Sequence, residues 1–222
     1  MLSTFIKASS SEDRLSITNL SNLQAATAAS VYTFSSANLG TPSLSRHIIV
    51  AGTMVIGSGS VSVTSVTVGG ETGTVTIEEV RTTATAFVSI TKVPSGATGD
   101  IVVTLSTTCD NLAISVFEVQ GAQTVSSAGS FISGGSLNGS SSITTADGGV
   151  LVGTRLAGGA ASSITLSWSN SITAINSTLL NTVFQRYMTS YSENSSTSET
   201  VSWTSVGSPF TRALAVASYQ PA

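Results

Sequence analysis

Charged residues are unusually few in this 222-residue sequence. Only 9% of its residues are charged, against about 25% in an ordinary globular domain, and the formal net charge is −3. The eight lysine and arginine residues are scattered singly, whereas proteins that bind nucleic acid cluster such residues to neutralise phosphates. The composition therefore predicts that nucleic acid is not a partner.

Cysteine and long apolar runs are also nearly absent. The single cysteine, Cys109, excludes an intrachain disulfide, so stability has to come from packing. No stretch of 18 or more apolar residues could form a transmembrane helix, and the N-terminal residues lack the apolar run of a signal peptide. We therefore expect no membrane partner.

Helical patterns are missing, and the pattern that is present is typical of strands. No segment keeps apolar residues at helical spacing for three turns, and the nearest candidate, residues 20–30, lacks a clear cap. Short runs of valine, isoleucine and threonine alternate with turn residues, which predicts an all-β chain folded as an antiparallel, jelly-roll-like β-sandwich. The expected strands are residues 31–35, 47–55, 61–68, 74–80, 84–91, 101–106, 112–119, 142–145, 150–156, 163–168, 182–191, 200–205 and 213–219.

The stretch SVTVGGETGTVTIEEV, residues 65–80, shows which side chains cover the two faces of the strands. Valine and isoleucine alternate with serine and threonine on both sides of Gly69-Gly70, which predicts a hairpin with one apolar and one hydroxyl-bearing face. Threonine costs less to desolvate than lysine or glutamate, so such faces suit packing between subunits. An exposed extracellular surface is the other explanation, and both favour a structural or adhesive role over an enzyme.

Five pairs of segments recur in the same order, which indicates an internal duplication. The pairs are RHIIVAGTMV with GGVLVGTRLA, SVTSVTVGG with ASSITLSWSNS, ATAFVSITK with NTVFQRYMTS, GDIVVTLST with SETVSWTSV, and LAISVFEVQGA with RALAVASYQPA. We expect half-repeats at about residues 31–122 and 141–222. Their arrangement as two small sandwiches is one alternative, and the preferred one combines them in one sandwich over residues 31–222. Residues 123–142 would cross between the halves, and residues 1–30 would form an N-terminal arm that docks on neighbours.

Groups of residues that could form a catalytic site have weak support in the sequence. His47 is the sole histidine, and a hydrolase built on Cys109, His47 and Asp110 requires these residues to meet in space. No G-x-S-x-G motif frames a nucleophile, and the adjacent pair Glu78 and Glu79 would point to opposite faces of a strand. We therefore expect a non-enzymatic protein without catalytic residues.

Metal and cofactor sites are not predicted either. Asp100, Asp110 and Asp147 each lie beside turn residues, where aspartate commonly bonds the backbone, and Asp147-Gly148 suits a hairpin turn between residues 142–145 and 150–156. Calcium would need several converging oxygen ligands, and no such loop occurs.

Aromatic residues offer one candidate contact surface. Trp168 and Trp203 share the phase of apolar neighbours and are expected in the core. The strand that carries Tyr187 and Tyr191 is apolar on both faces, so these two tyrosines are the candidate partner contacts.

Four segments of the first half resemble a β-sandwich module that recurs in virion proteins of tailed bacteriophages. They are YTFSSANLG…SRHIIVAG, VTSVTVGG, KVPSGATGDIVVTLS and ISVFEVQGA, and they span about residues 31–122. The most specific pieces are residues 66–70 and the turn from Pro94 to Asp100, although GGETG departs from the usual small apolar residues after GG.

The resemblance carries no catalytic residues and implies a location in the virion. The protein would be a capsid decoration or head-fibre component that packs with other virion proteins and with copies of itself. The alternative is a tail-associated or extracellular module that binds carbohydrate on a host surface.

Overall fold

The computed structural model describes residues 14–121, 124–132, 138–158, 165–169, 173–181, 185–193, 198–206 and 211–222. Strands make up 73% of the structure, and these ranges contain no helix. Among the described residues there is accordingly no apolar helix of membrane-spanning length. The predicted all-β class is confirmed, with antiparallel sheets packed against one another.

The first half of the chain forms two facing sheets. The first inner sheet has the strand order β1 (Ser16–Ala25), β9 (Asn111–Gln120), β3 (His47–Val55), β7 (Ala84–Lys92) and β6 (Thr74–Arg81). The first outer sheet has the order β2 (Ala29–Asn38), β8 (Thr98–Cys109), β4 (Val63–Val68) and β5 (Glu71–Thr72).

The second half repeats this plan. The second inner sheet has the order β10 (Val125–Ile132), β17 (Thr211–Pro221), β12 (Val150–Gly158), β15 (Gln185–Glu193) and β14 (Thr173–Asn181). The second outer sheet has the order β11 (Asn138–Thr144), β16 (Ser198–Val206) and β13 (Thr165–Ser169). Strand by strand, the order of the second half matches that of the first, with β5 as the only extra strand of the described residues.

Each half is a sandwich in its own right, with jelly-roll-like connections. In the first half the chain passes from inner to outer sheet and back, except where β4 leads to β5 and β6 leads to β7. Neighbours within a sheet are therefore mostly distant in sequence, as in a jelly roll. Of the two arrangements considered from the sequence, this one corresponds to two sandwiches, whereas the preferred one had residues 123–142 crossing within a single sandwich. Residues 125–132 are instead the edge strand β10.

The five repeated segment pairs fall on strands that occupy corresponding places, but the register of one pair differs. β3 places His47 opposite Val119, and β12 places Val150 opposite Tyr219. His47 therefore corresponds to Val150, one residue away from the match suggested by RHIIVAGTMV and GGVLVGTRLA. A slip of one residue exchanges the two faces of a strand, so the pairing ladder decides the alignment.

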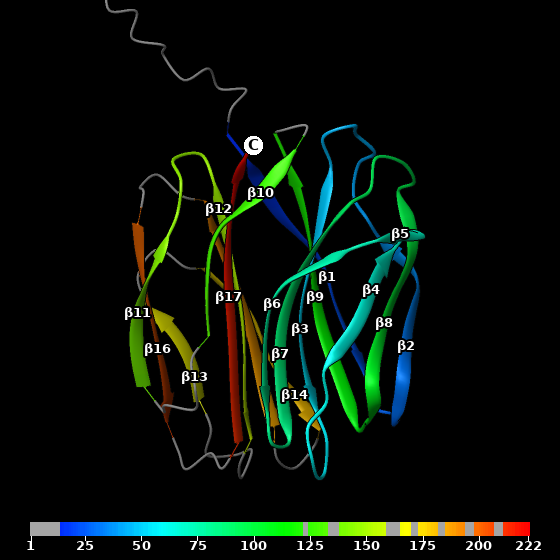
Figure 1. Ribbon diagram of the computed structural model, residues 1–222, viewed down its shortest axis with the longest axis vertical. Helices are drawn as coiled ribbons and strands as arrows, with labels where there is room; N and C mark the ends of the chain where they lie inside the picture. The colour runs from blue at the N-terminus through cyan, green and yellow to red at the C-terminus, as the bar shows by residue number, and fades with distance from the viewer. Residues whose placement is uncertain are drawn as a thin grey trace, which may run out of the picture.

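The two inner sheets pack face to face, which gives four layers. In Figure 1 the second outer sheet lies at the left, the two inner sheets in the middle and the first outer sheet at the right. One apolar cluster joins the inner sheets. Its first-half members include Ile49, Ala51, Val88, Ala113, Phe117 and Val119, and its second-half members are Val150, Val152, Leu156, Ala213, Ala215, Ala217 and Tyr219.

Specific polar and aromatic contacts also cross this inner interface. The Tyr219 hydroxyl is fully buried and donates to Thr76 Oγ1 at 2.9 Å. The ring of Tyr191 meets Phe117 edge-on, with centroids 5.9 Å apart. The Leu15 amide donates to the Gly148 carbonyl at 2.6 Å. The two sandwiches are thus joined by a buried interface that is matched in both shape and hydrogen bonding.

The predicted hairpin of residues 65–80 is only partly present. Val66 and Val68 are buried, and Gly69 and Gly70 form the turn with positive φ angles of 60° and 89°. The hairpin then pairs β4 with the short β5 alone, and beyond Gly73 the chain crosses to the inner sheet as β6. A Cβ on Gly73 would lie 2.3 Å from Thr91 Oγ1, so the crossing is too tight for a side chain.

Part of the expected N-terminal arm belongs to the sandwich. Residues 16–25 form β1, which pairs with β9 along the first inner sheet, and Leu15 and Ile17 are buried in the inner interface. Residues 20–30, the nearest candidate for a helix in the sequence, are not helical, because this segment ends β1 and begins β2. Residues 1–13 lie outside the described residues.

Two truncations distinguish the strand from the segment before it. Removing residues 1–13 keeps every described strand and should change the free energy of unfolding by less than about 0.5 kcal/mol. Removing residues 1–29 deletes β1 with Leu15 and Ile17 and exposes the edge of β9 to solvent. This should lower the free energy of unfolding by about 3 kcal/mol or more. Urea unfolding followed by tryptophan fluorescence measures both, and equal stability of the two truncated chains would contradict the assignment of β1.

Candidate functional site

The three residues considered for hydrolysis are not brought together. His47 begins β3, whereas Asp110 lies at the other end of that strand, where its amide donates to the Val55 carbonyl at 2.8 Å. Eight residues of extended chain separate these two ends by roughly 27 Å. The imidazole therefore has no access to Cys109 or Asp110.

Cys109 is a packed thiol rather than an activated nucleophile. It is fully buried, with its Sγ 3.3 Å from the hydroxyl of Tyr32, and that hydroxyl donates to the Cys109 carbonyl at 2.7 Å. Burial raises the pKa of the thiol, which keeps it protonated near neutral pH. A protonated thiol is a weak nucleophile.

His47 is likewise held by its surroundings. Its side chain is 5% exposed, and Nδ1 lies 3.1 Å from the Ser45 carbonyl. Burial, assisted by the nearby charge of Lys92, lowers the pKa of the imidazole below its ordinary value of 6.5. The ring is therefore neutral near pH 7.

The acidic pair occupies two faces of β6, as predicted from strand geometry. The Glu78 carboxylate accepts a hydrogen bond from the Val63 amide of β4 at 2.6 Å, and burial raises its pKa. Glu79 shares the opposite face with Ile77 of the inner interface and is paired with Arg81. Each carboxylate therefore anchors a different neighbour.

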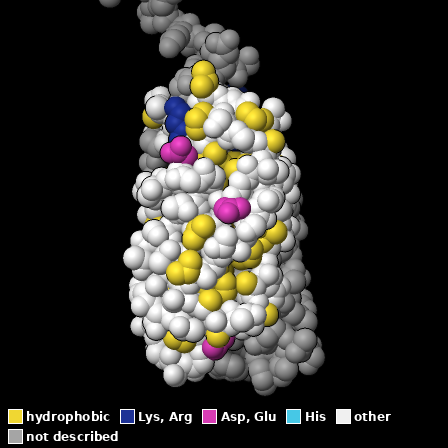
Figure 2. All heavy atoms as spheres, turned by 90° about the vertical axis from the view of Figure 1, so that its right-hand side faces the viewer, with side chains coloured by type: hydrophobic (Ala, Val, Ile, Leu, Met, Phe, Trp, Pro, Cys, Tyr) yellow, Lys and Arg dark blue, Asp and Glu magenta, His cyan; other side chains and the backbone are white. Residues whose placement is uncertain are grey.

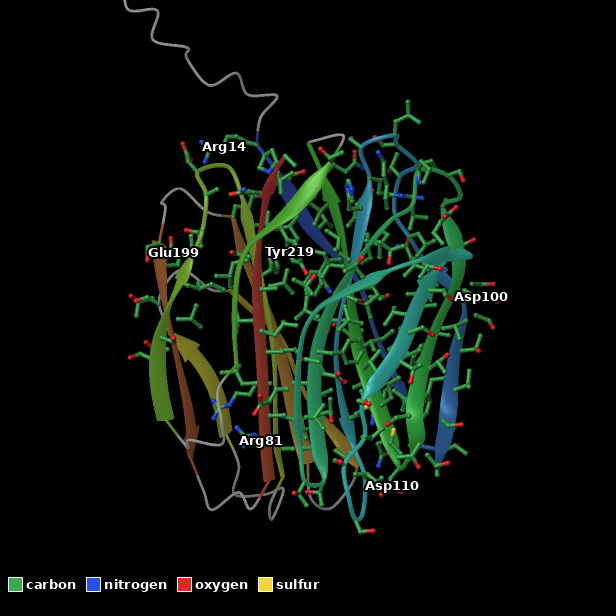
Figure 3. All side chains as sticks on the ribbon, in the orientation of Figure 1. Arg14, Arg81, Asp100, Asp110, Glu199 and Tyr219 are labelled. Carbon is green, nitrogen blue, oxygen red and sulfur yellow. The ribbon has the colours of Figure 1, made fainter. Side chains whose placement is uncertain are left out.

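The remaining aspartates are dispersed. Asp147 forms an exposed ion pair with Arg14 at 3.4 Å, and its turn joins β11 to β12, which belong to different sheets, so the predicted hairpin is not formed. Figure 3 shows Arg14, Asp100 and Asp110 at separate margins of the molecule. Among the described residues, no three histidine, cysteine or acidic side chains are grouped to hold a metal ion.

The two candidate tyrosines lie on β15 of the second inner sheet. Tyr191 is partly buried and packs against the inner interface, so only part of its ring is available to a partner. Tyr187 pairs with Leu156 of β12, and its side chain lies outside the described residues. Trp168 of β13 pairs with Trp203 of β16, and the side chains of both tryptophans lie outside the described residues.

The first outer sheet presents a surface that is poor in charge, which we call the threonine face. It is built from outward-facing residues of β2, β8 and β4. Two rows run across these strands, Val31–Thr104–Ser65 and Thr33–Val102–Thr67. In Figure 2, which views this side, hydrophobic side chains gather among uncharged polar side chains and backbone, and charged groups are few, with an acidic group beside a basic one near the top.

The edge of the threonine face is also without charge. β2 is an edge strand, and its sequence, ASVYTFSSAN, contains no lysine, proline or acidic residue. Val31 on this strand is 52% exposed. Sheets that do not pair with a neighbour usually protect such edges with charge, proline or β-bulges. β2 has register irregularities at residues 29–31 and 34–37 but neither charge nor proline, so the row between them is suited to be covered by a neighbour.

A hollow of about 490 Å³ lies at one end of the threonine face. It is formed where the Gly69-Gly70 turn and the start of β8 meet the turn at Ser95 and Gly96. Asp100, Thr67 and Thr98 supply polar side chains, and Asp100 Oδ1 accepts a hydrogen bond from the Ser36 amide at 3.0 Å. This is a concave site with a few convergent polar groups.

Arg46 fixes the turn that forms one wall of the hollow. Its guanidinium is fully buried, and all of its hydrogen bonds described here go to backbone carbonyls. They are Nε to Val93 at 2.7 Å, Nη1 to Leu39 at 2.9 Å and to Gly40 at 3.2 Å, and Nη2 to Ser95 and Gly96, each at 2.7 Å.

Sequence reasoning overlooked the role of Arg46. An arginine placed directly before the apolar strand 47–55, in a chain with eight basic residues, was the available signal. The hollow itself had no sequence signal, because its walls come from two segments that are separated in the sequence, between residues 67 and 70 and between residues 95 and 102.

Comparison with known proteins assigns the chain to no family. No protein-family model matches the chain, and no curated protein matches it. The functional argument therefore depends on the structure described above.

Replacing Arg46 by lysine tests the arginine cluster. An ammonium group has three donors, so at least two of the five carbonyls lose their partner, and each buried loss costs about 1–3 kcal/mol. We expect Arg46→Lys to lower the free energy of unfolding by about 3 kcal/mol. Arg81→Lys, at a side chain 44% exposed, is the control and should change it by less than about 0.5 kcal/mol. Urea unfolding measures both, and similar losses would contradict the assignment.

His47 should make stability dependent on pH. Its folded-state pKa lies below the unfolded value of 6.5, so on acidification the unfolded chain binds the proton first. Stability from the neutral imidazole is therefore present above about pH 6.5 and is lost as the pH falls toward the folded-state pKa. His47→Gln should show a shallower fall in unfolding free energy between about pH 7.5 and about pH 5. Equal slopes for the two proteins would show that the histidine is not responsible.

Proposed function

We propose that this chain is a non-enzymatic structural protein of a tailed-bacteriophage virion, a capsid decoration or head-fibre component that packs with other virion proteins and with copies of itself. The observation that carries the proposal is the threonine face with its uncharged edge strand. Lysine and glutamate would have to be desolvated in an interface, whereas threonine and valine are covered at low cost.

The architecture supports the same proposal. Jelly rolls are common in viral capsid proteins, and the segments that resemble a phage virion module lie on β2, β3, β4, β8 and β9 of the first sandwich. These strands build the threonine face and its supporting core. The proposal assigns no catalytic role to His47, Cys109 or Asp110.

The docking segment of the proposal is now confined to residues 1–13. Residues 16–25 are occupied as β1, so they are not free to reach a neighbour. A chain that lacks residues 1–13 keeps both sandwiches and loses only this segment.

The copy number of the chain tests the proposal. Quantitative mass spectrometry of purified particles from its source would compare it with the major capsid protein. A ratio near that of the capsid protein is expected for a decoration component, and a smaller fixed ratio for a head fibre. A few copies in the tail would favour the alternative module for host recognition, and absence from particles would overturn the proposal.

Incorporation into particles separates docking from folding. We expect Thr33→Lys, which places a charge on the threonine face, and the chain without residues 1–13 each to fold normally and to be incorporated at least about tenfold less. Ser58→Lys, in an exposed loop away from this face, is the control and should be incorporated normally. Normal incorporation of Thr33→Lys would exclude the threonine face as the contact.

A further inference from the structure

The hollow beside the threonine face is shaped by backbone rather than by side chains. A Cβ on Gly99 would lie 2.9 Å from the Gly69 Cα, so these two backbone segments are in direct contact. A Cβ on Gly70 would meet no other heavy atom within 4 Å, so this residue leaves open space. The volume of about 490 Å³ falls within the range of about 300–1,000 Å³ found for small-molecule sites.

The walls of the hollow are held before any ligand arrives. Arg46 fixes the carbonyls of Ser95 and Gly96, each at 2.7 Å. The Gly69 amide donates to the Asp100 carbonyl at 2.8 Å, and the Asp100 carboxylate is held by the Ser36 amide. A site held in this way loses little conformational entropy when a ligand binds.

The lining groups select the ligand by charge. Thr67, Ser95 and Thr98 contribute hydroxyls that donate and accept, and Asp100 contributes an acidic acceptor with lone pairs beyond the one used by Ser36. The lining contains no lysine, arginine or histidine, so an anionic ligand would find no cation and would be repelled by the negative charge of Asp100. One carboxylate is also too few for calcium, which takes six to eight oxygen ligands.

We propose that this hollow binds a neutral sugar. Sugar hydroxyls donate to the Asp100 carboxylate and exchange hydrogen bonds with Thr67 and Thr98, while Val102 contacts carbon-bound hydrogens of the ring. The inference does not rest on the structural role proposed above, because a virion protein or an extracellular module could each carry such a site. It also places sugar contact at the first outer sheet rather than at Tyr187 and Tyr191.

Saturation-transfer NMR on the full chain tests the proposal with glucose, galactose, mannose and N-acetylglucosamine as free probes. A parallel glycan array presents the same sugars in polymeric form, and the two arms distinguish a free sugar from a surface glycan. We expect a signal with at least one sugar. Asp100→Asn and Thr98→Val should each weaken it by about tenfold, since the first replaces a charged acceptor by a neutral amide and the second removes a hydroxyl.

Matched controls lie on or directly after the same strand. Asp110→Asn and Thr107→Val remove the same chemical groups at the far end of β8, and binding should be unchanged in both. Unfolding curves of all four variants exclude a loss of structure as the cause. The absence of binding in both arms, or binding that survives both Asp100→Asn and Thr98→Val, would overturn the proposal.

Discussion

The packing of the two inner sheets against each other is the constraint on which the rest of this structure depends. All nine residues of β3 are buried, because its side chains contact its own outer sheet on one face and the opposite inner sheet on the other. A half that folded alone would expose an apolar sheet face to water, and burial of such a face supplies most of the driving force for folding. The two sandwiches therefore stabilise each other.

The two halves differ in side-chain size at equivalent places of this interface. Phe117 in β9 corresponds to Ala217 in β17, and Val119 corresponds to Tyr219. All four lie in the inner interface, so a large residue of one half is matched by a small residue at the equivalent place in the other. Alternation of large and small residues fills such a space without voids or overlap, which two identical halves could not do as well.

The outer surfaces follow from the same arrangement. Because the inner sheets cover each other, surfaces for partners are left to the outer sheets, the edges and the loops. The threonine face combines low charge with an edge strand that lacks charge and proline. The hollow combines open space beside the backbone with one carboxylate, which is held by the Ser36 amide. These neighbouring features suit different contacts: the first is suited to a broad protein surface, and the second to a small polar ligand.

How far the sequence could predict the fold depended on where each strand lies. Central strands such as β3 and β9 were predicted because burial on both faces requires a run of apolar residues. The strands that were missed, β1, β5, β10 and β14, are all edge strands, whereas the edge strands β2, β6, β11 and β13 were predicted. A strand with one neighbour tolerates polar residues, as in β1, which reads SITNLSNLQA. An edge strand pairs with a neighbour on one side only, so burial constrains its residues less, and the apolar pattern of its sequence is weaker than that of a central strand.

The sequence by itself determined the all-β class, the repeated segments and the alternation of valine with threonine, because each of these depends on near neighbours along the chain. Tertiary structure alone decided that each repeat is a whole sandwich, that the chain changes sheets at Gly73, and that His47 lies far from Cys109. It also brought the segment at residues 67–70 and the segment at residues 95–102 together around the hollow. These outcomes depend on which sheet faces pair across the layers, and that choice is made by the fit of side chains distant in sequence.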